Sequence, residues 1–573
     1  MLFTAATFLS CAKKSDSSSE LLLFNARVYT LSWGEPDLEG RPADDAPYRD
    51  DRGWSPDADA VLIRDGRIVV AGTADEVRAQ AGADARSLDL GGATVLPGLV
   101  ESHTHIAELG GQLRQVDLTG VDTEDEAVRR VAERSRKTPA GEWILGHGWD
   151  EGAWADRYPT LDKLSDAVPD HPVVLASLHG FAVWGNRKAL EIAGIGADTE
   201  DPSGGEIRRD GQGRPTGILL NRATRLLHDA VPKPSLAERE RQILAGLEAM
   251  AEAGYVAVHE AGVGEAMLEA FVSLDERGAL PLRVHAMLSA REPDLMDTWV
   301  ERGPKSSEDR KLAIRSVKAY YDGALGSRGA RLIEDYADRP GHRGVSGSDY
   351  DFDADRVAAM MRAGFQVGVH AIGDAGNREV LDFLERVFEG DPGAAAHRHR
   401  IEHAQILHPD DVDRFGRLGV VASMQPPHAM EDKGWAGDRL GPERLRGAYA
   451  WRSLRRAGAR LAFNSDLPGS SHDIFYGLHS AITRTDPSGQ PAGGWLPAEK
   501  MTAEEAVRGY TIWGSYSAFD EARAGTIEPG KRADLTILDV DPFVLGESDP
   551  ARLLDGHVLA TIVDGEVLHD ALP

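Results

Sequence analysis

The stretch Leu96-Pro97-Gly98-Leu99-Val100-Glu101-Ser102-His103-Thr104-His105 joins a short apolar run to two histidines that are separated by one residue. In a β-strand, residues i and i+2 face the same side, so His103 and His105 can present their imidazoles to one metal ion, which Thr104 cannot reach. Such a pair alone is weak evidence, because two histidines on a strand are often only polar surface. A metal site requires further ligands from other parts of the chain.

The residues that follow alternate short apolar runs with helical stretches, the pattern typical of βα units and a parallel sheet. Polar residues recur where the apolar runs end, which is where a TIM barrel holds its chemistry. We therefore predict an α/β fold with a (β/α)8 barrel. Roughly 405 positions separate Leu96 from Lys500, well above the ~250 of a plain barrel, so we expect a subdomain inserted after the first barrel strand, at about residues 110–233.

Specific segments carry this prediction. The helices are expected at Ser235–Ala253, Ala354–Gly364 and Asn377–Phe388. The strands are expected at Ala93–Leu96, Val173–Ala176, Val256–His259, Leu282–Ala286, Ile314–Lys318, Gln366–His370, His399–His403, Val420–Met424 and Arg460–Asn464.

Both ends of the chain are rich in strand signals. The pairs Asp65-Gly66 and Asp564-Gly565 stand between β-rich runs and favour hairpins, because both central positions of a type I′ turn take positive φ. We predict that the two ends build one small β-sandwich domain, and that the acidic, Pro/Gly-rich stretch from Trp33 to Asp59 is an exposed loop. The predicted organisation is a signal-like segment and tether (1–20), the first part of the β-sandwich (21–95), the barrel domain (96–500), and the last helix with the second part of the β-sandwich (501–573).

Composition excludes several classes of protein. The 64 Lys and Arg against 93 Asp and Glu give a formal net charge of −29, which repels phosphate backbones, so we expect no nucleic-acid partner. Hydrophobic residues at 42% and charged residues at 27% are ordinary for a globular chain and exclude global disorder. Cys11 is the single cysteine, so an intrachain disulfide is excluded.

The first twenty residues have a character of their own. Residues 1–11 are apolar, and residues 12–20 indicate a polar tether. The end of the apolar run, Leu9-Ser10-Cys11, is similar to the processing site of a bacterial lipoprotein signal, which implies lipidation of Cys11 and a lipid anchor in the cell envelope, on the periplasmic side. No Lys or Arg precedes the run. The alternative is a disordered N-terminus with a chance cysteine, which predicts a cytoplasmic protein.

Four further polar residues stand at the ends of predicted strands or directly after them: Lys318, His370, His403 and Asp466. Additional motifs follow the same order along the chain, namely Gly146-His147-Gly148-Trp149-Asp150, Pro159-Thr160-Leu161-Asp162, His179 followed by Asn186, Pro202-Ser203-Gly204-Gly205, Pro215-Thr216-Gly217, and the run from Gly525 to Leu535.

With these motifs the sequence resembles the amidohydrolase superfamily, and within it the metal-dependent hydrolases of amidohydrolase family 3, of the YtcJ type. The resemblance covers nearly everything from Leu21 to the C-terminus. Two positions depart from the family pattern, because Glu101 and Glu260 stand where aspartate is common. Neither is a direct ligand in the family, so we expect altered surroundings of the ligands at most.

The resemblance implies that one or two divalent ions, expected to be zinc, are bound by His103, His105, His370, His403 and Asp466. It also implies that Lys318 bridges two ions after carbamylation by carbon dioxide. The chemistry agrees, since an ammonium cannot bind a cation whereas a carbamate offers two anionic oxygens. The metal would lower the pKa of bound water from about 16 toward ~7.

The same resemblance assigns the catalytic roles. Asp466 would take the proton as hydroxide attacks a carbonyl carbon and would pass it to the leaving nitrogen, while a metal or His403 polarises the carbonyl oxygen. If Lys318 stays a cationic amine, the alternatives are a mononuclear site of His103, His105, His403 and Asp466, or a structural ion pair between Lys318 and Asp322.

Candidates for binding a small-molecule substrate are His179, Trp184, His259 and Arg328, which occur in family motifs; Arg328 can clamp a carboxylate. Each also has a structural interpretation: Trp184 packs the inserted subdomain, His259 bonds within the barrel, and Arg328 pairs with Asp322 or caps a helix. We predict that the remaining histidines His397, His399, His557 and His569 lie at the surface.

The predicted function is hydrolysis of an amide-type carbon–nitrogen bond other than a peptide bond. One alternative is a deaminase or an ester or lactone hydrolase on the same scaffold, because an activated water attacks many electrophiles. Another is a non-catalytic, surface-tethered binding lipoprotein. The oligomeric state is left open, with a homodimer as one option.

Overall fold

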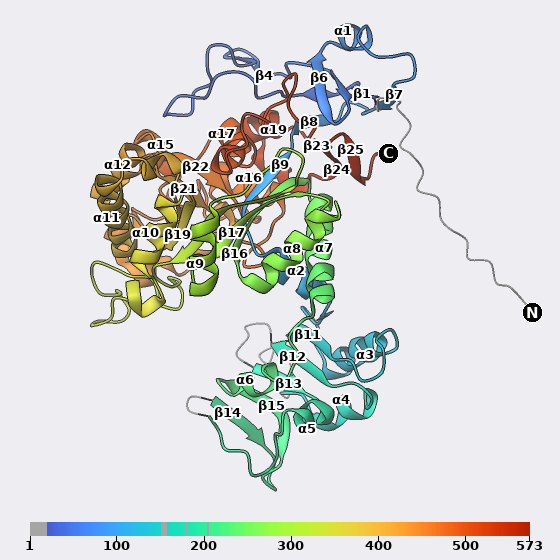
Figure 1. Ribbon diagram of the computed structural model, residues 1–573, viewed down its shortest axis with the longest axis vertical. Helices are drawn as coiled ribbons and strands as arrows, with labels where there is room; N and C mark the ends of the chain where they lie inside the picture. The colour runs from blue at the N-terminus through green and yellow to red at the C-terminus, as the bar shows by residue number, and fades with distance from the viewer. Residues whose placement is uncertain (1–19, 150–157, 178–181, 203–204) are drawn as a thin grey trace, which may run out of the picture.

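The computed structural model describes residues 20–149, 158–177, 182–202 and 205–573; Cys11 and His179 lie outside these ranges. At its centre eight parallel strands form a nearly closed barrel, which confirms the predicted (β/α)8 architecture (Figure 1). Their order around the barrel is β9 (Leu99–Thr104), β16 (Tyr255–Val263), β17 (Arg283–Ser289), β18 (Leu312–Tyr320), β19 (Gln366–Ala371), β20 (Arg400–His403), β21 (Val421–Met424) and β22 (Arg460–Phe463).

The barrel closes where its first strand meets its last. The Ser102 hydroxyl on β9 donates a hydrogen bond to the Phe463 carbonyl of β22 at 2.9 Å. Thr104, the last residue of β9, forms a parallel bridge with Leu467 in the loop after β22. Segments that are far apart in sequence therefore become neighbours at this seam.

Helices cover the outside of the barrel, so the strands are buried on both faces and read as continuous apolar runs. Ser235, for example, caps α7, its side chain accepting a hydrogen bond from the Glu238 backbone N–H. The helices of this layer are α2 (Ile106–Leu113), α7 (Leu236–Glu252), α8 (Glu265–Glu276), α9 (Pro293–Arg302), α10 (Ala354–Arg362), α11 (Asp374–Gly390), α12 (Pro409–Leu418), α13 (Pro426–Asp432), α14 (Ala436–Leu445, kinked at Gly441), α15 (Trp451–Arg456), α16 (Ile474–Thr483), α17 (Ala503–Gly509) and α18 (Ile512–Ser517).

A subdomain is inserted between α2 and α7 and lies beyond one end of the barrel (Figure 1). Its six-stranded sheet has the order β10-β11-β12-β13-β15-β14. Trp149 and Trp184 are buried in its apolar core. Its elements are β10 (Val116–Asp117), α3 (Glu124–Ser135), β11 (Ile144–Trp149), α4 (Leu161–Ala167), β12 (Val173–Ser177), β13 (Ala182–Gly185), α5 (Arg187–Ile192), β14 (Gly205–Arg209), β15 (Pro215–Asn221) and α6 (Thr224–His228).

The two ends of the chain share one sheet at the opposite end of the barrel (Figure 1). It has the order β2-β8-β23-β24-β25 and packs on a second sheet, β6-β5-β1-β7, across a common apolar core. The strands are β1 (Glu20–Phe24), β2 (Arg27–Val28), β5 (Ala60–Arg64), β6 (Arg67–Gly72), β7 (Arg86–Asp89), β8 (Thr94–Pro97), β23 (Leu535–Leu538), β24 (Val558–Val563) and β25 (Glu566–Asp570), with α1 (Ala74–Arg78) and α19 (Pro542–Ser548) beside them.

The hairpin predictions are confirmed by the backbone. Asp65 and Gly66 have φ of 52° and 74°, and Asp564 and Gly565 have φ of 52° and 77°. Both pairs thus occupy the left-handed region that a type I′ turn requires.

The prediction of an exposed loop from Trp33 to Asp59 is confirmed for most of the segment but is wrong for several apolar residues. Trp33, Ala46 and Trp54 are each at most 6% exposed and belong to the main apolar core. The segment folds back as the short hairpin β3 (Tyr48–Arg49) and β4 (Gly53–Trp54), and Trp54 contacts the ring of Phe543 in α19. The acidic, Pro/Gly-rich composition gives no sign of these three buried residues. Both tryptophans contact Phe543, which is distant in sequence.

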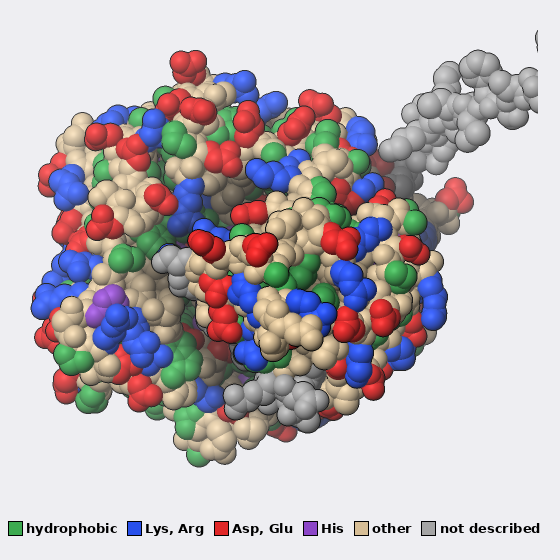
Figure 2. All heavy atoms as spheres, turned by 90° about the horizontal axis from the view of Figure 1, so that it is seen from below, with side chains coloured by type: hydrophobic (Ala, Val, Ile, Leu, Met, Phe, Trp, Pro, Cys, Tyr) green, Lys and Arg blue, Asp and Glu red, His purple; other side chains and the backbone are tan. Residues whose placement is uncertain are grey.

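On the face that Figure 2 shows, acidic and basic side chains are interspersed. Within the described part of the chain, every helix is too short or too polar to cross a bilayer.

Candidate metal centre

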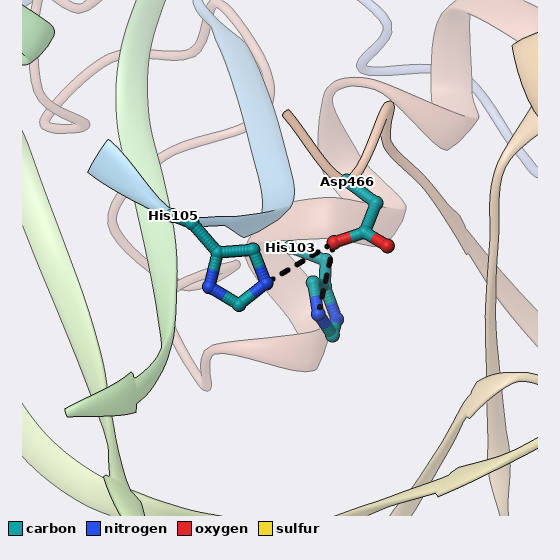
Figure 3. Close-up of side chains that lie close together, drawn as sticks. All are labelled: His103, His105 and Asp466. Atoms are coloured by element: carbon teal, nitrogen blue, oxygen red, sulfur yellow. Dashed lines mark ion pairs between the residues drawn. The ribbon is translucent and has the colours of Figure 1, made fainter. Parts of the chain in front are cut away.

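Three side chains converge where β9 ends and β22 gives way to its loop (Figure 3). His103 is the last but one residue of β9, His105 follows the strand and precedes α2, and Asp466 lies in the loop after β22. Oδ1 of Asp466 is 3.5 Å from Nε2 of His103 and 3.3 Å from Nε2 of His105. The predicted histidine pair therefore meets a carboxylate across the barrel seam.

The spacing of these atoms suits a divalent ion. An ion held tetrahedrally at ~2.0–2.2 Å from each ligand separates the ligand atoms by roughly 3.3–3.6 Å, which is the range found here. A second possible set, His403, His428 and Asp466, has its ligand atoms within 4.8 Å of one another. Both sets are of the nitrogen and oxygen type that zinc accepts.

Lys318 and His370 approach the same place from β18 and β19. Nζ of Lys318 lies 3.1 Å from Nε2 of His103. The His370 and His403 rings have their centroids 4.4 Å apart, and Nε2 of His370 lies 3.7 Å from Oδ1 of the buried Asp322. All six predicted ligands are thus brought together.

Two of these residues have strained backbones. His403 and Asp466 adopt φ of 75° and 57°, in the left-handed region that non-glycine residues rarely occupy. Such a conformation costs on the order of 1–3 kcal/mol and persists only where the surroundings enforce it. At the ends of β20 and β22 it turns both side chains toward the centre of the cluster.

Burial sets the protonation of the histidines. It lowers the pKa of His103 to about 4 and that of His403 to about 3, with Lys318 adding to the effect in both cases. Neutral imidazoles are the form that binds a metal. Burial raises the pKa of Asp466, but the neighbouring imidazoles of His103 and His105 oppose it, and the net pKa lies well below its ordinary value. The cluster thus combines the neutral imidazoles of His103 and His403 with an ionised carboxylate, whereas Asp466 outweighs burial at His105 and raises its pKa.

On the side away from Asp466, the His103 ring contacts the first of a series of buried polar groups. Nδ1 of His103 is 2.6 Å from Oε2 of Glu402, whose other oxygen is 2.7 Å from Nε of Arg400. Arg400 in turn lies 3.0 Å from Nδ1 of His259. Burial raises the pKa of Glu402, but Arg400 and His103 oppose it and keep the net pKa well below the ordinary value. An ionised Glu402 orients the ring so that Nε2 faces the cluster.

The two departures from the family pattern support the ligands rather than joining them. Glu101 accepts a hydrogen bond from the Ser465 backbone N–H at 2.5 Å, next to Asp466. Glu260 accepts hydrogen bonds from the Thr104 hydroxyl at 2.9 Å and from the Ile106 backbone N–H at 2.7 Å, on either side of His105. Both carboxyls therefore shape the ligand loops.

Asp322, the alternative partner of Lys318, has other partners. Its carboxylate accepts hydrogen bonds from three backbone N–H groups, those of Arg331, Ile372 and Gly373, at 2.8–2.9 Å. Burial raises its pKa to about 7. Asp322 thus fixes the loop that follows β19 and His370.

The described substrate-binding candidates lie elsewhere. Trp184 is in the core of the inserted subdomain, with its indole N–H directed to the Thr160 carbonyl at 3.3 Å. His259 is buried inside the barrel against Arg400. Arg328 forms a two-point ion pair with Asp338, at 2.7 and 3.1 Å. These contacts match the structural interpretations of Trp184 and His259 and give Arg328 a partner other than Asp322.

Two residues near the cluster were missed in the sequence. His428 stacks parallel to His403, and the Gln425 side-chain carbonyl lies 3.0 Å from Nδ1 of His403. Both follow β21, so the rule that polar residues after barrel strands carry the chemistry points to them.

With this geometry described, a comparison with protein families matches residues 86–569 to the amidohydrolase family. The chain belongs to the amidohydrolase family. The resemblance drawn from the ordered motifs is thereby confirmed.

Individual relatives match along most of their length. YtcJ of Bacillus subtilis (strain 168) is 30% identical over 89% of this chain and 96% of its own. N-substituted formamide deformylase of Arthrobacter pascens is 30% identical over 90% of this chain and 95% of its own. An uncharacterized metal-dependent hydrolase from Pyrococcus furiosus superposes with a TM-score of 0.72 at 27% identity, covering 91% of this chain and all of the other. These similarities support a hydrolase.

Proposed function

We propose that this protein is a metal-dependent amidohydrolase that cleaves an amide-type carbon–nitrogen bond other than a peptide bond. The observation that carries the proposal is the cluster of His103, His105 and Asp466 at the carboxyl end of the barrel, in which Oδ1 of Asp466 lies 3.5 and 3.3 Å from the two imidazoles, as ligands of one tetrahedral ion would. The similarity to a relative named N-substituted formamide deformylase supports the bond class and makes N-formyl and N-acyl amines the first substrates to test.

When bound, a zinc-type ion supplies Lewis acidity that activates water for attack on a carbonyl carbon. His103, His370 and His403, whose pKa burial lowers, would hold it through neutral imidazoles, together with His105 and Asp466. The ionised carboxylate of Asp466 would accept the proton of the attacking water and deliver it to the nitrogen as the carbon–nitrogen bond breaks. The products are a carboxylic acid and an amine.

Lys318 suits the bridging role because burial lowers its pKa to about 8, so that more of it is neutral near pH 7 than of an ordinary lysine. A neutral Nζ attacks carbon dioxide, a nitrogen–carbon bond forms, and Nζ releases one proton to solvent. The resulting carbamate offers two anionic oxygens for a pair of ions. Bicarbonate should therefore be present in the assay.

The first test measures metal content and turnover together. We expect one or two divalent ions per chain after gentle purification, and hydrolysis of at least one N-formyl amine, N-acyl amine or cyclic amide with zinc and bicarbonate present. Asp466→Asn should keep most of the metal and lose about 10²- to 10⁴-fold in kcat, the usual contribution of a proton-transfer group.

Asp438→Asn is the matched control, because Asp438 is an exposed aspartate on α14. Unchanged turnover in Asp466→Asn would show that another group moves the proton. A chain that binds no metal and turns over no substrate would favour the binding-protein alternative, and release of ammonia from an amidine substrate would favour the deaminase.

A further inference from the structure

A cavity of about 60 Å³ lies at the opposite mouth of the barrel from the metal cluster. It is lined by the amino-terminal parts of β16, β17 and β18, and by the segment between α18 and β23. A water molecule needs about 10–15 Å³ by this measure, so the cavity holds a group of four to six water-sized atoms. That is the size of a small oxyanion.

The lining of this cavity is strongly basic. In a chain with a net charge of −29, it combines two acidic side chains, Asp520 and Asp534, with six basic ones. The basic residues are Arg283, Arg310, Lys311, Arg315, Arg523 and Arg532.

Both acids are already engaged. Asp534 accepts a two-point ion pair from Arg283, at 2.7 and 3.1 Å. Asp520 is shared between Arg523, at 2.7 Å, and Arg532, at 2.5 Å. Outside the wall, Asp275 lies 3.7 Å from Arg310 and Asp564 lies 3.8 Å from Lys311. In the part of the chain that the structure describes, Arg315 is therefore the one basic residue of this lining without an ion pair.

Arg315 is the least compensated of these cations. Its guanidinium stacks on the Phe519 ring at 3.7 Å, and its Nε is buried without a hydrogen-bond partner. Burial lowers the pKa of Arg315, and the nearby Arg398 and Arg523 lower it further. The same two causes, burial and a neighbouring arginine, lower the pKa of Arg532. A bound anion would raise the pKa of both arginines, because it stabilises their charged forms.

A second unpartnered group borders the same cavity. His285 is 5% exposed, and its Nδ1 is buried without a hydrogen-bond partner, whereas its Nε2 is 2.6 Å from the Ser316 hydroxyl. The Ser316 hydroxyl donates to the Gln366 side-chain carbonyl at 2.7 Å, so Nε2 of His285 carries the ring proton and donates to Ser316, and Nδ1 is an acceptor. The cavity thus offers a ligand one buried donor, on Arg315, and one buried acceptor, on His285, which matches an oxyanion that retains a proton on one oxygen.

We propose that this basic cavity is a binding site for a small oxyanion, with Arg315 as the principal cation and His285 at its inner wall. A planar guanidinium matches two oxygens of a carboxylate, phosphate or sulfate. The site is separate from the metal cluster, because His259, Arg400 and Glu402 lie between His285 and His103.

The test uses the full-length protein with its metal. Calorimetric titration with sulfate, inorganic phosphate and formate, at an ionic strength held constant with sodium chloride, should show one saturable site per chain for at least one of them. The order of affinities separates a tetrahedral anion from a carboxylate. Arg315→Gln should weaken binding at least about 10-fold, as expected when one charged hydrogen-bond donor is lost.

Two comparisons keep the result decisive. Arg315→Lys retains the charge without the fork and should weaken binding to an intermediate extent, which provides a test if the glutamine variant folds poorly. Arg339→Gln, at an exposed arginine outside the cavity, should bind as the wild type does. Metal content should stay constant across all variants. Absence of saturable binding in the wild type, or equal affinity in Arg315→Gln and Arg339→Gln, would overturn the proposal.

Discussion

The imidazole of His103 is fixed through Nδ1 by a buried carboxylate, which leaves Nε2 free for the metal cluster. Glu402 can do this only because Arg400 balances its charge inside the barrel, at 2.7 Å. Histidines that bind metals commonly rely on such a partner, which fixes the tautomer and the orientation of the ring. The metal affinity of the site should therefore depend partly on residues that do not contact the ion.

Glu402→Gln should weaken both metal binding and the fold. The variant keeps a hydrogen-bond acceptor for His103 but leaves Arg400 buried without its counter-charge, which typically costs about 3–5 kcal/mol. We expect metal affinity, measured by competition with a chelator, to fall about 10- to 100-fold. Glu248→Gln, at an exposed glutamate of α7, is the control. Equal affinity in the two variants would mean that Glu402 has no part in holding the ring.

For individual residues, the sequence predicted which side chains would converge better than it predicted the residues that support them. His103, His105 and Asp466 could be predicted because their spacing and their place after strands follow from strand geometry and from the family pattern. His428 and the Arg400–Glu402 pair were not, since a buried ion pair depends on which side chains from different strands point inward at the same level. His399 is another such case: it was predicted to be at the surface, yet it is 1% exposed.

Strand β20 contributes more to the site than its length suggests. Its four residues, Arg400–His403, include the predicted ligand His403 and the Arg400–Glu402 pair that supports His103. The residue before it, His399, ties the strand to its surroundings. Nδ1 of His399 accepts a hydrogen bond from the Val367 backbone N–H at 3.0 Å, and Nε2 donates one to the Ala394 carbonyl at 2.8 Å. Both bonds require a neutral ring with its proton on Nε2.

His399 should make stability depend on pH. Burial lowers its pKa from 6.5 to about 4 in the folded chain, so the unfolded chain binds the extra proton. Its contribution is complete above pH 6.5 and is lost progressively as the pH falls toward 4, by roughly 3 kcal/mol at most. Urea denaturation of the wild type and of His399→Gln at pH 8, 6.5 and 5 should show a shallower loss in the variant. Parallel pH profiles would contradict this assignment.

Seven of the nine expected strands match barrel strands β16 to β22 to within a few residues, because a parallel sheet buried on both faces leaves uninterrupted apolar runs in the sequence. Ile314–Lys318 and Val420–Met424, for example, fall within or nearly coincide with β18 and β21. The other two lie outside the barrel: Ala93–Leu96 falls on β8 of the terminal sheet, and Val173–Ala176 falls on β12 of the inserted subdomain. The prediction for Trp33–Asp59 failed at its buried tryptophans, because their partners lie at the far end of the chain. Composition predicts whether a segment is exposed only where its own residues, rather than distant partners, determine its burial.

Across the whole molecule, the amino-terminal segment is fastened to the last helices. The Trp33 indole N–H donates to Oε1 of Glu504 at 2.8 Å, and Arg508 donates to the Trp33 backbone carbonyl at 3.2 Å. Trp33 also meets the edge of the Phe543 ring. Residues nearly five hundred positions apart thus belong to one cooperative core.

Trp33→Ala should destabilise the protein by about 3–5 kcal/mol, the usual cost of removing a large buried aromatic side chain. The loss includes the hydrogen bond to Glu504, which is itself buried. Leu38→Ala is the matched control in the same segment, because Leu38 is 46% exposed and should change stability by less than about 0.5 kcal/mol. Urea denaturation curves that coincide for the two variants would show that the segment is only loosely attached.

The seam between β9 and β22 also has a consequence for biosynthesis. The ribosome releases His103 and His105 long before Asp466, so the three ligands can first meet when the last strand docks beside the first. A nascent polypeptide that ends before β22 carries the histidine pair without its carboxylate. Metal acquisition should therefore be a late event in maturation, one that reports the completion of the entire cylinder rather than the synthesis of any single segment.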